Sequence, residues 1–207
     1  MQFTPYLEFC IQVFELLTAL LATWYWKKYK DSTERNFIYF FWVLFIIDLT
    51  GVILNKKTDL DTYFIYNSFN IFHFAFLLRW YTKILVNKSI VFLNIGYVLF
   101  LIFVIIQYNI FESFIKIHYV VGVIIILICT FLYSTQVLNS NKIFNLKYSL
   151  SFWITIGHII LFVGMIPLVL LLEYMKINAL SFKIVLILLN FIAYTCYSLG
   201  FIWTKKQ

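Results

Sequence analysis

Six polar or ionisable side chains interrupt the long apolar stretches of this sequence. They are two acids, two histidines and two asparagines: Glu15, Asp48, Asn70, His73, His158 and Asn190. Ionisable groups within a membrane are costly and usually face the interior of a helical bundle, so they are the first candidates for a functional site. A buried carboxylate near a histidine can share a proton, respond to pH or bind a cationic ligand.

The spacing of these residues places them on single helical faces. The polar stripes are Glu8–Gln12–Glu15–Ala19, Asn67–Asn70–His73, Ser151–Thr155–His158 and Asn190–Tyr194–Tyr197–Ser198. If the stripes point inward, the bundle has a polar pocket that opens toward the outer surface. The alternative is that these side chains only fix helix packing, at about 0.6 kcal/mol for each interhelical hydrogen bond. We expect His118, at the outer end of its apolar stretch, to be solvated.

No catalytic or metal-binding motif accompanies these residues. The sequence contains no HExxH, HxxxH, GxSxG, Walker A or GxGxxG pattern. Zinc sites usually need three or four nitrogen, oxygen or sulfur ligands, and two histidines on different helices give too few for a di-haem site. The cysteines Cys10, Cys129 and Cys196 lie far apart in apolar stretches and are expected to be free thiols. The sequence therefore predicts no catalytic residue, no metal and no cofactor, and it favours a protein that is not an enzyme.

The composition indicates what must position these groups. Of the 207 residues, 63% are hydrophobic and 12% are charged, and the mean hydropathy is +0.92. A soluble domain is about 45–50% apolar and about 25% charged, so a soluble fold is excluded. The net charge of +7 is interpreted as lysines in loops beside a lipid bilayer and not as a nucleic-acid interface.

Seven apolar segments have the length of a spanning helix, about 20 residues. They cover residues 6–26, 37–54, 63–84, 90–108, 115–138, 148–172 and 180–203. The third segment is the most polar, because it contains Asn67, Asn70, His73 and Arg79. The connecting segments are too short to fold alone, so residues 1–207 form a single transmembrane domain of the all-α class.

The distribution of basic residues predicts the orientation. Eleven of the 16 Lys and Arg residues fall on one side: Lys27, Lys28, Lys30, Arg35, Arg79, Lys83, Lys88, Lys142, Lys147, Lys205 and Lys206. Cytoplasmic loops carry the excess of Lys and Arg. We therefore expect the N-terminus outside and the C-terminus in the cytoplasm. The weak likeness of FFWVLFIIDLTGVI to SFWITIGHIILFVGMI allows a 3+1+3 repeat, a build known from small transporters.

Four segments resemble a family of small, uncharacterised seven-helix membrane proteins of Bacteroidota. They are WYWKKYK, FIYNSFNIFHF, YSLSFWITIGHIILFVGMIPL and NFIAYTCYSLGFIWTKK. Asp48, in the run Asp-Leu-Thr-Gly, stands where the resemblance leads us to expect an acid followed by a small residue. The resemblance covers most of the chain and implies a bacterial inner membrane, but it implies no activity. SWEET-like sugar carriers share the size and topology, but the prolines they carry in the first helix of each triplet are absent here.

Three classes of function are compatible with this pattern. The favoured one is a non-enzymatic sensory or partner-binding membrane protein, which would pass its state to a separate effector protein because the chain has no output domain. The first alternative is a small-solute or proton-coupled transporter. The second is an intramembrane enzyme that acts on lipids.

Overall fold

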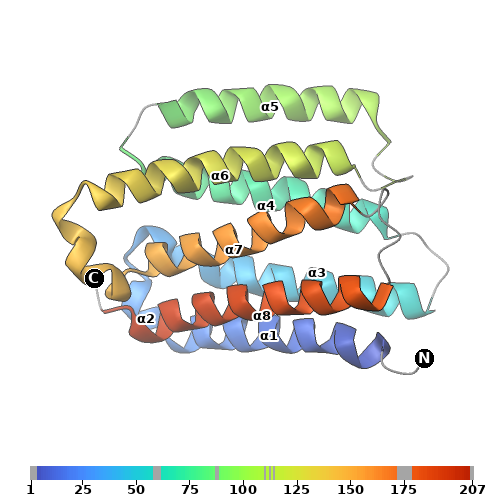
Figure 1. The fold of residues 1–207 in the computed structure, drawn as a ribbon, viewed down its shortest axis with the longest axis horizontal. Coiled ribbons are helices and arrows are strands. Elements are labelled where there is room, and N and C mark those ends of the chain that lie inside the picture. Colours follow the sequence, from blue (N-terminus) through green and yellow to red (C-terminus); the bar gives the residue numbers. More distant parts are fainter. Residues whose placement is uncertain are drawn as a thin grey trace. The chain divides into compact units, whose positions relative to one another are not determined.

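The computed structural model describes residues 4–57, 62–86, 89–109, 111, 113, 115–171 and 179–205. Within these ranges the chain forms helices and no strands (Figure 1). The elements in chain order are α1 (Thr4–Trp24), α2 (Trp26–Tyr29), η1 (Thr33–Asn36), α3 (Phe37–Lys57), α4 (Tyr63–Ile84), α5 (Ser89–Gln107), α6 (Lys116–Leu138), η2 (Asn141–Tyr148), α7 (Leu150–Leu171) and α8 (Ala179–Trp203). The expected all-α class is confirmed for this part of the chain.

Five helical segments are long and apolar enough to cross a membrane. They cover Thr33–Leu54, Ile90–Gln107, Lys116–Leu138, Leu150–Leu170 and Ser181–Trp203, and Phe9–Trp24 is a shorter apolar helix. Large apolar side chains stay exposed along them, among them Phe92, Ile106 and Phe131. Contiguous apolar surface of this kind is typical of helices that face lipid. The chain therefore has the helices of a multi-pass membrane protein.

The helices lie where the sequence predicts apolar segments. α4 has the expected bounds, and the other long helices differ from the expected segments by a few residues at their ends. α4 is not among the strongly apolar segments, in keeping with the polar residues that make its segment the weakest of the seven. Of the residues used to predict the orientation, Lys88 and Lys206 lie outside the described residues, and so does Lys176, one of the five basic residues on the opposite side. The expected end of the sixth segment at Leu172 also lies outside them.

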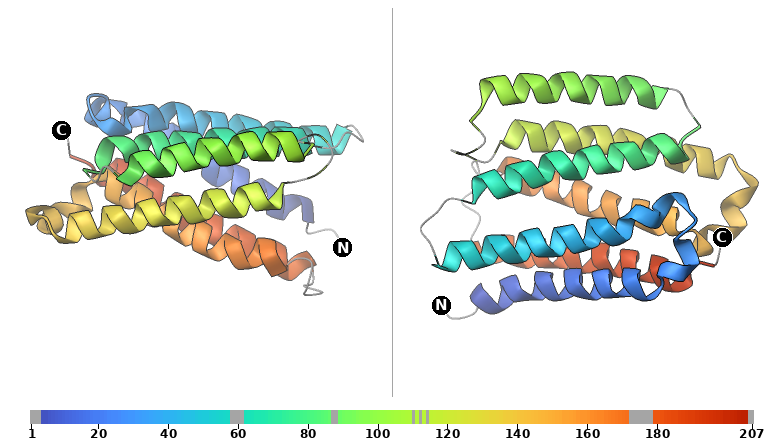
Figure 2. Two further views of the ribbon diagram at one scale, coloured as in Figure 1. Left: turned by 90° about the horizontal axis from the view of Figure 1, so that it is seen from above. Right: turned by 180° about the vertical axis from the view of Figure 1, so that it is seen from behind.

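The chain forms two compact units, Met1–Phe45 with Phe144–Gln207 and Ile46–Ile143. In the first unit α8 packs against both α1 and α7, and α1 and α8 run side by side in both views (Figures 1 and 2). The absence of a side chain at Gly157 and Gly200 lets α7 and α8 approach closely. A Cβ on Gly157 would lie 2.3 Å from Cε1 of Tyr197, and one on Gly200 would lie 2.7 Å from Cβ of Trp153.

In the second unit α4, α5 and α6 pack against one another. The Gln136 side chain on α6 fixes the end of α4, because its Nε2 donates to the Ile84 carbonyl at 3.0 Å and its Oε1 accepts from the Val86 amide at 2.9 Å. At the other end, Asn67 on α4 holds the start of α6. Its Nδ2 donates to the Ser113 carbonyl at 2.8 Å, and its Oδ1 accepts from the Ile115 amide at 3.1 Å.

Candidate functional site

The polar stripe on α1 lies in the interface with α8. Gln12, Glu15, Thr18, Ala19 and Ala22 are all buried, and they recur every three or four residues, which is one face of a helix. The stripe is therefore buried as its spacing predicts. The side chain of Glu8, which begins the stripe, lies outside the described part of the structure, so Glu8 is not included in the site.

Two hydrogen bonds join α1 to α8 along this face. The phenolic hydroxyl of Tyr194 donates to Oε1 of Glu15 at 2.9 Å, and the Glu15 side chain is only 4% exposed. One turn further on, the hydroxyls of Thr18 and Ser198 lie 3.2 Å apart. We refer to Glu15, Thr18, Tyr194 and Ser198 as the polar seam. A hydrogen bond to an ionised acceptor is stronger than one between neutral groups, so Tyr194 is well placed to respond to the charge of Glu15.

His158 and Asn190 lie in the same unit and are also buried. The Nδ1–H of His158 donates to the Ile154 carbonyl at 2.8 Å, because a carbonyl oxygen can only accept. The His158 ring lies 5.2 Å from the ring of Tyr197, between centroids. Asn190 donates from Nδ2 to the Leu186 carbonyl at 2.8 Å. Both side chains thus donate a hydrogen bond to a backbone carbonyl of their own helix.

A series of aromatic contacts leads from the polar seam to the α2 segment. Tyr194 contacts Tyr197 at 5.7 Å between ring centroids, and Tyr197 contacts Phe41 at 5.2 Å. Phe41 contacts Phe201 at 5.7 Å, Phe201 contacts Tyr29 at 5.2 Å, and Tyr29 contacts Trp26 at 5.3 Å. We call the series Tyr194–Tyr197–Phe41–Phe201–Tyr29–Trp26 the aromatic relay.

Packing around the relay separates the polar seam from the α2 segment. Ala19, Ala22 and Phe201 are completely buried, and Phe41 is nearly so. The Tyr29 hydroxyl donates to the Ala22 carbonyl at 2.6 Å, which holds α2 against α1. These four side chains are apolar, and the ring contacts of the relay run from the polar seam to the α2 segment.

The other three candidates belong to the second unit. Asp48 on α3 and Asn70 on α4 are partly exposed, and His73 on α4 is buried. The His73 ring packs 5.4 Å from Phe69 and 5.7 Å from Phe74, between centroids. The six candidates are therefore divided, with Glu15, His158 and Asn190 in one unit and Asp48, Asn70 and His73 in the other.

The expectation for His118 is wrong. It is 2% exposed, and its Nε2 lies 3.1 Å from the Tyr97 hydroxyl. Its ring stacks on that of Phe100 at 6.4 Å between centroids and meets the ring of Phe74 edge-on at 5.7 Å. The sequence position near the end of the segment indicated solvent, but α4 and α5 cover this side of α6.

Glu34 is a buried acid that the sequence analysis missed. It lies in the polar run between two apolar segments, yet it is 2% exposed. Its Oε1 accepts hydrogen bonds from the Ser151 hydroxyl and from the Thr33 hydroxyl, the latter at 2.8 Å. Ser32, which accepts from the Glu34 amide at 3.2 Å, starts η1 as an N-cap. The Ser-Thr-Glu capping pattern was the one local signal that η1 is ordered.

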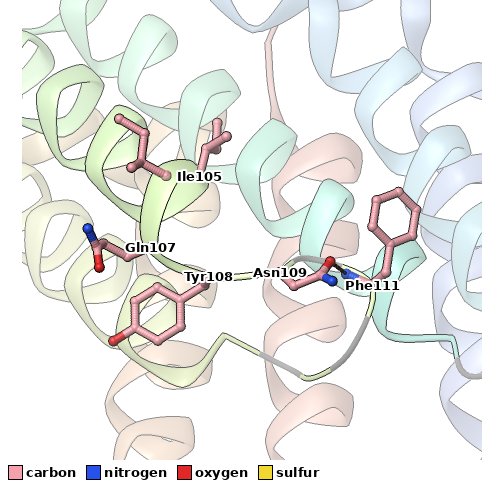
Figure 3. A pocket seen from close by; sticks show the side chains of 6 residues that line it. Ile105, Gln107, Tyr108, Asn109 and Phe111 are labelled. Carbon is pink, nitrogen blue, oxygen red and sulfur yellow. Dashed lines mark hydrogen bonds between the residues drawn. The ribbon is translucent and has the colours of Figure 1, made fainter.

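One hollow of about 450 Å³ lies at the end of α5. It is lined by Ile105, Ile106, Gln107, Tyr108, Asn109 and Phe111. The side chains of Tyr108 and Phe111 point in different directions and do not converge on a common centre (Figure 3). Among the described residues, its lining includes none of the six candidates and no carboxylate or histidine, so we do not assign the site to it.

Searches for relatives give no assignment. In the described part of the chain, no group of three His, Cys, Asp or Glu side chains lies close enough to hold a metal ion. No family model matches the chain, and neither a curated protein nor a solved structure resembles it significantly. The polar seam and the aromatic relay are thus the features on which a functional assignment must rest.

Proposed function

We propose that this chain is a non-enzymatic sensory or partner-binding protein of the bacterial inner membrane. The single observation that carries the proposal is the buried Glu15 carboxylate, which is hydrogen-bonded to Tyr194 at one end of the aromatic relay. A change in the charge of Glu15, caused by a proton or a cationic ligand, would change how strongly it holds Tyr194. The relay would pass this change to the α2 segment, and a separate effector protein would read the altered conformation of that segment.

The proposal includes seven spanning helices with the N-terminus outside. α1 and α8 run parallel, since Glu15 and then Thr18 of α1 contact Tyr194 and then Ser198 of α8. Lys28 of α2 continues the order with the Ile202 carbonyl. Two parallel spanning helices must be separated in the chain by an odd number of other spanning helices. The helices between α1 and α8 are α3, α4, α5, α6 and α7, so their number is odd only if α4 also spans the membrane. The 22 residues of α4 extend about 33 Å at 1.5 Å per residue, which matches a hydrocarbon core of about 30 Å.

Transport is the alternative that the same residues could serve, because a buried acid with a hydroxyl partner also suits proton coupling. The apolar packing between the polar seam and α2 favours sensing. A continuous path would need polar groups or water at the depth of Ala19, Ala22 and Phe201, and these side chains are completely buried.

A double-mutant cycle tests the sensing proposal. The full chain in lipid nanodiscs is compared with E15Q, F41A and E15Q/F41A by hydrogen exchange of the peptide covering residues 25–36. Glu15→Gln keeps an acceptor for Tyr194 but removes the charge, so we expect it to change exchange in this peptide. Phe41→Ala interrupts the relay and should abolish the difference that Glu15→Gln makes. Phe45→Ala, a truncation one turn away and outside the relay, is the matched control.

Two results would contradict the proposal. If Glu15→Gln alters exchange equally with and without Phe41, the relay does not connect the two regions. If proteoliposomes that contain the chain and an entrapped pH dye show proton flux that Glu15→Gln removes, the protein is a proton-coupled transporter instead of a sensor.

A further inference from the structure

One end of the first unit carries a dense group of cations. It comprises Lys27, Lys28 and Lys30 from the α2 segment, Arg35 from η1, Lys147 from η2, and Lys205 after α8. The acids in these segments are Asp31 and Glu34, and the Glu34 carboxylate is buried against Ser151 and Thr33. The surface of this end, which we call the basic end, is therefore strongly positive.

Aromatic rings fix two of these lysines in place. Nζ of Lys147 lies 4.8 Å from the ring centroid of Trp203, and Nζ of Lys205 lies 3.8 Å from that of Tyr148. The two pairs cross-link the end of η2 with the end of α8. Trp153 adds to this arrangement, since its Nε1 donates to the Lys147 carbonyl at 2.9 Å. An ammonium group over a ring face keeps its outer hydrogens available to a further acceptor.

Among the residues that the structure describes, no carboxylate pairs with the cations of the basic end. In the described part of the chain, neither Lys147 nor Lys205 forms an ion pair, and Lys28 donates to the Ile202 carbonyl at 2.9 Å and lies 4.3 Å from the centroid of the Tyr25 ring. Lys27, Lys30 and Arg35 also have no carboxylate partner there. The positive charge of this end is thus available to a ligand from outside the chain.

We propose that the basic end binds the phosphate groups of anionic phospholipids. Exposed aromatic residues place this end at the level of the lipid headgroups: Trp24 is 82% exposed at the end of α1, and Tyr39 is 65% exposed near the start of α3. Trp and Tyr side chains concentrate at the membrane–water interface. Clustered lysines and arginines next to a membrane helix attract anionic lipids. A headgroup phosphate reaches this position without leaving the bilayer, whereas an acidic protein would have to dock beside it.

Native mass spectrometry of the full chain released from nanodiscs tests this binding. The nanodiscs contain equal amounts of phosphatidylcholine and phosphatidylglycerol, and the lipids retained by the wild type are compared with those retained by K147Q/K205Q. We expect the wild type to retain phosphatidylglycerol in preference to phosphatidylcholine. Removing two ring-held lysines should lower this preference about thirtyfold.

The controls separate a local site from general charge. K116Q/K183Q removes the same total charge elsewhere and should keep the preference, as should K147R/K205R, which conserves the charge at the basic end. The proposal is overturned if K147Q/K205Q and K116Q/K183Q lower the preference equally, or if the wild type shows none. Displacement of phosphatidylglycerol by soluble inorganic phosphate at equal phosphate concentration would also overturn it, because the site would then recognise a free phosphate. Equal circular dichroism spectra show that the variants are folded.

Discussion

Substituting Gly157 by alanine tests the packing at the centre of the first unit. A Cβ added there would lie 2.3 Å from Cε1, 2.8 Å from Cδ1 and 2.9 Å from Cζ of Tyr197. Because these distances are far below van der Waals contact, the Tyr197 ring must move. Tyr197 is buried and contacts both His158 and Phe41, so it has no free space to enter. Overpacking of this kind costs about 1–3 kcal/mol.

The matched control is Gly96→Ala on α5. A Cβ at Gly96 meets nothing within 4 Å, so this variant gains helix propensity without a clash and is expected to be more stable by up to about 1 kcal/mol. Chemical unfolding in mixed micelles, followed by circular dichroism, measures both free energies. A Gly157→Ala variant as stable as the wild type, or a Gly96→Ala variant destabilised to the same extent, would refute the packing inferred at Tyr197.

Three further perturbations have defined outcomes. Asn67→Leu removes the bonds to Ser113 and Ile115 and should lower the unfolding free energy by about 1–3 kcal/mol, whereas Asn70→Leu, at a partly exposed position, should change it little; equal losses would contradict the role of Asn67. Glu34→Ala leaves two hydroxyl donors without their acceptor and should destabilise the fold more than Glu34→Gln does; the reverse order would contradict a structural role for this carboxylate. Burial raises the pKa of Tyr29, so the stability that this phenol contributes is complete below about pH 10 and falls as the pH rises further. Denaturant unfolding at several alkaline pH values should therefore show that the unfolding free energy of Tyr29→Phe falls less steeply with pH than that of the wild type. An equally steep fall in both proteins would contradict the raised pKa of Tyr29.

The positions of the helices could be predicted because a bilayer imposes a simple rule. A spanning helix must be long, apolar and internally hydrogen-bonded, so the expected bounds of α4 agree with the structure even though Asn67 and His73 lower its hydropathy. The burial of Glu15 followed from its place on a stripe with Gln12 and Ala19. Periodicity shows which face of a helix is buried without any knowledge of the helix that covers it.

The partners of these residues could not be predicted in the same way. Tyr194 and Glu15 are 179 positions apart, and several other polar residues at similar depth were equally plausible partners. His118 was misjudged because its exposure depends on Tyr97 and Phe100 of α5, which no local pattern of α6 reveals. Glu34 was missed because a short polar segment reads as a solvated loop unless the packing of Ser151 against it is known.

The pairing of α1 with α8 has a consequence for biosynthesis. In the proposed seven-helix topology Glu15 enters the membrane with α1, but the Tyr194 hydroxyl that binds it is synthesised 179 residues later. At a typical rate of 5–20 residues per second, this delay is on the order of 10–40 s. During that time the nascent helix must hold its carboxylate near water, within the insertion machinery or in the neutral acid form. The first unit can close only after α8 has been synthesised, so a chain arrested before α8 would present an unfinished unit to quality-control proteases.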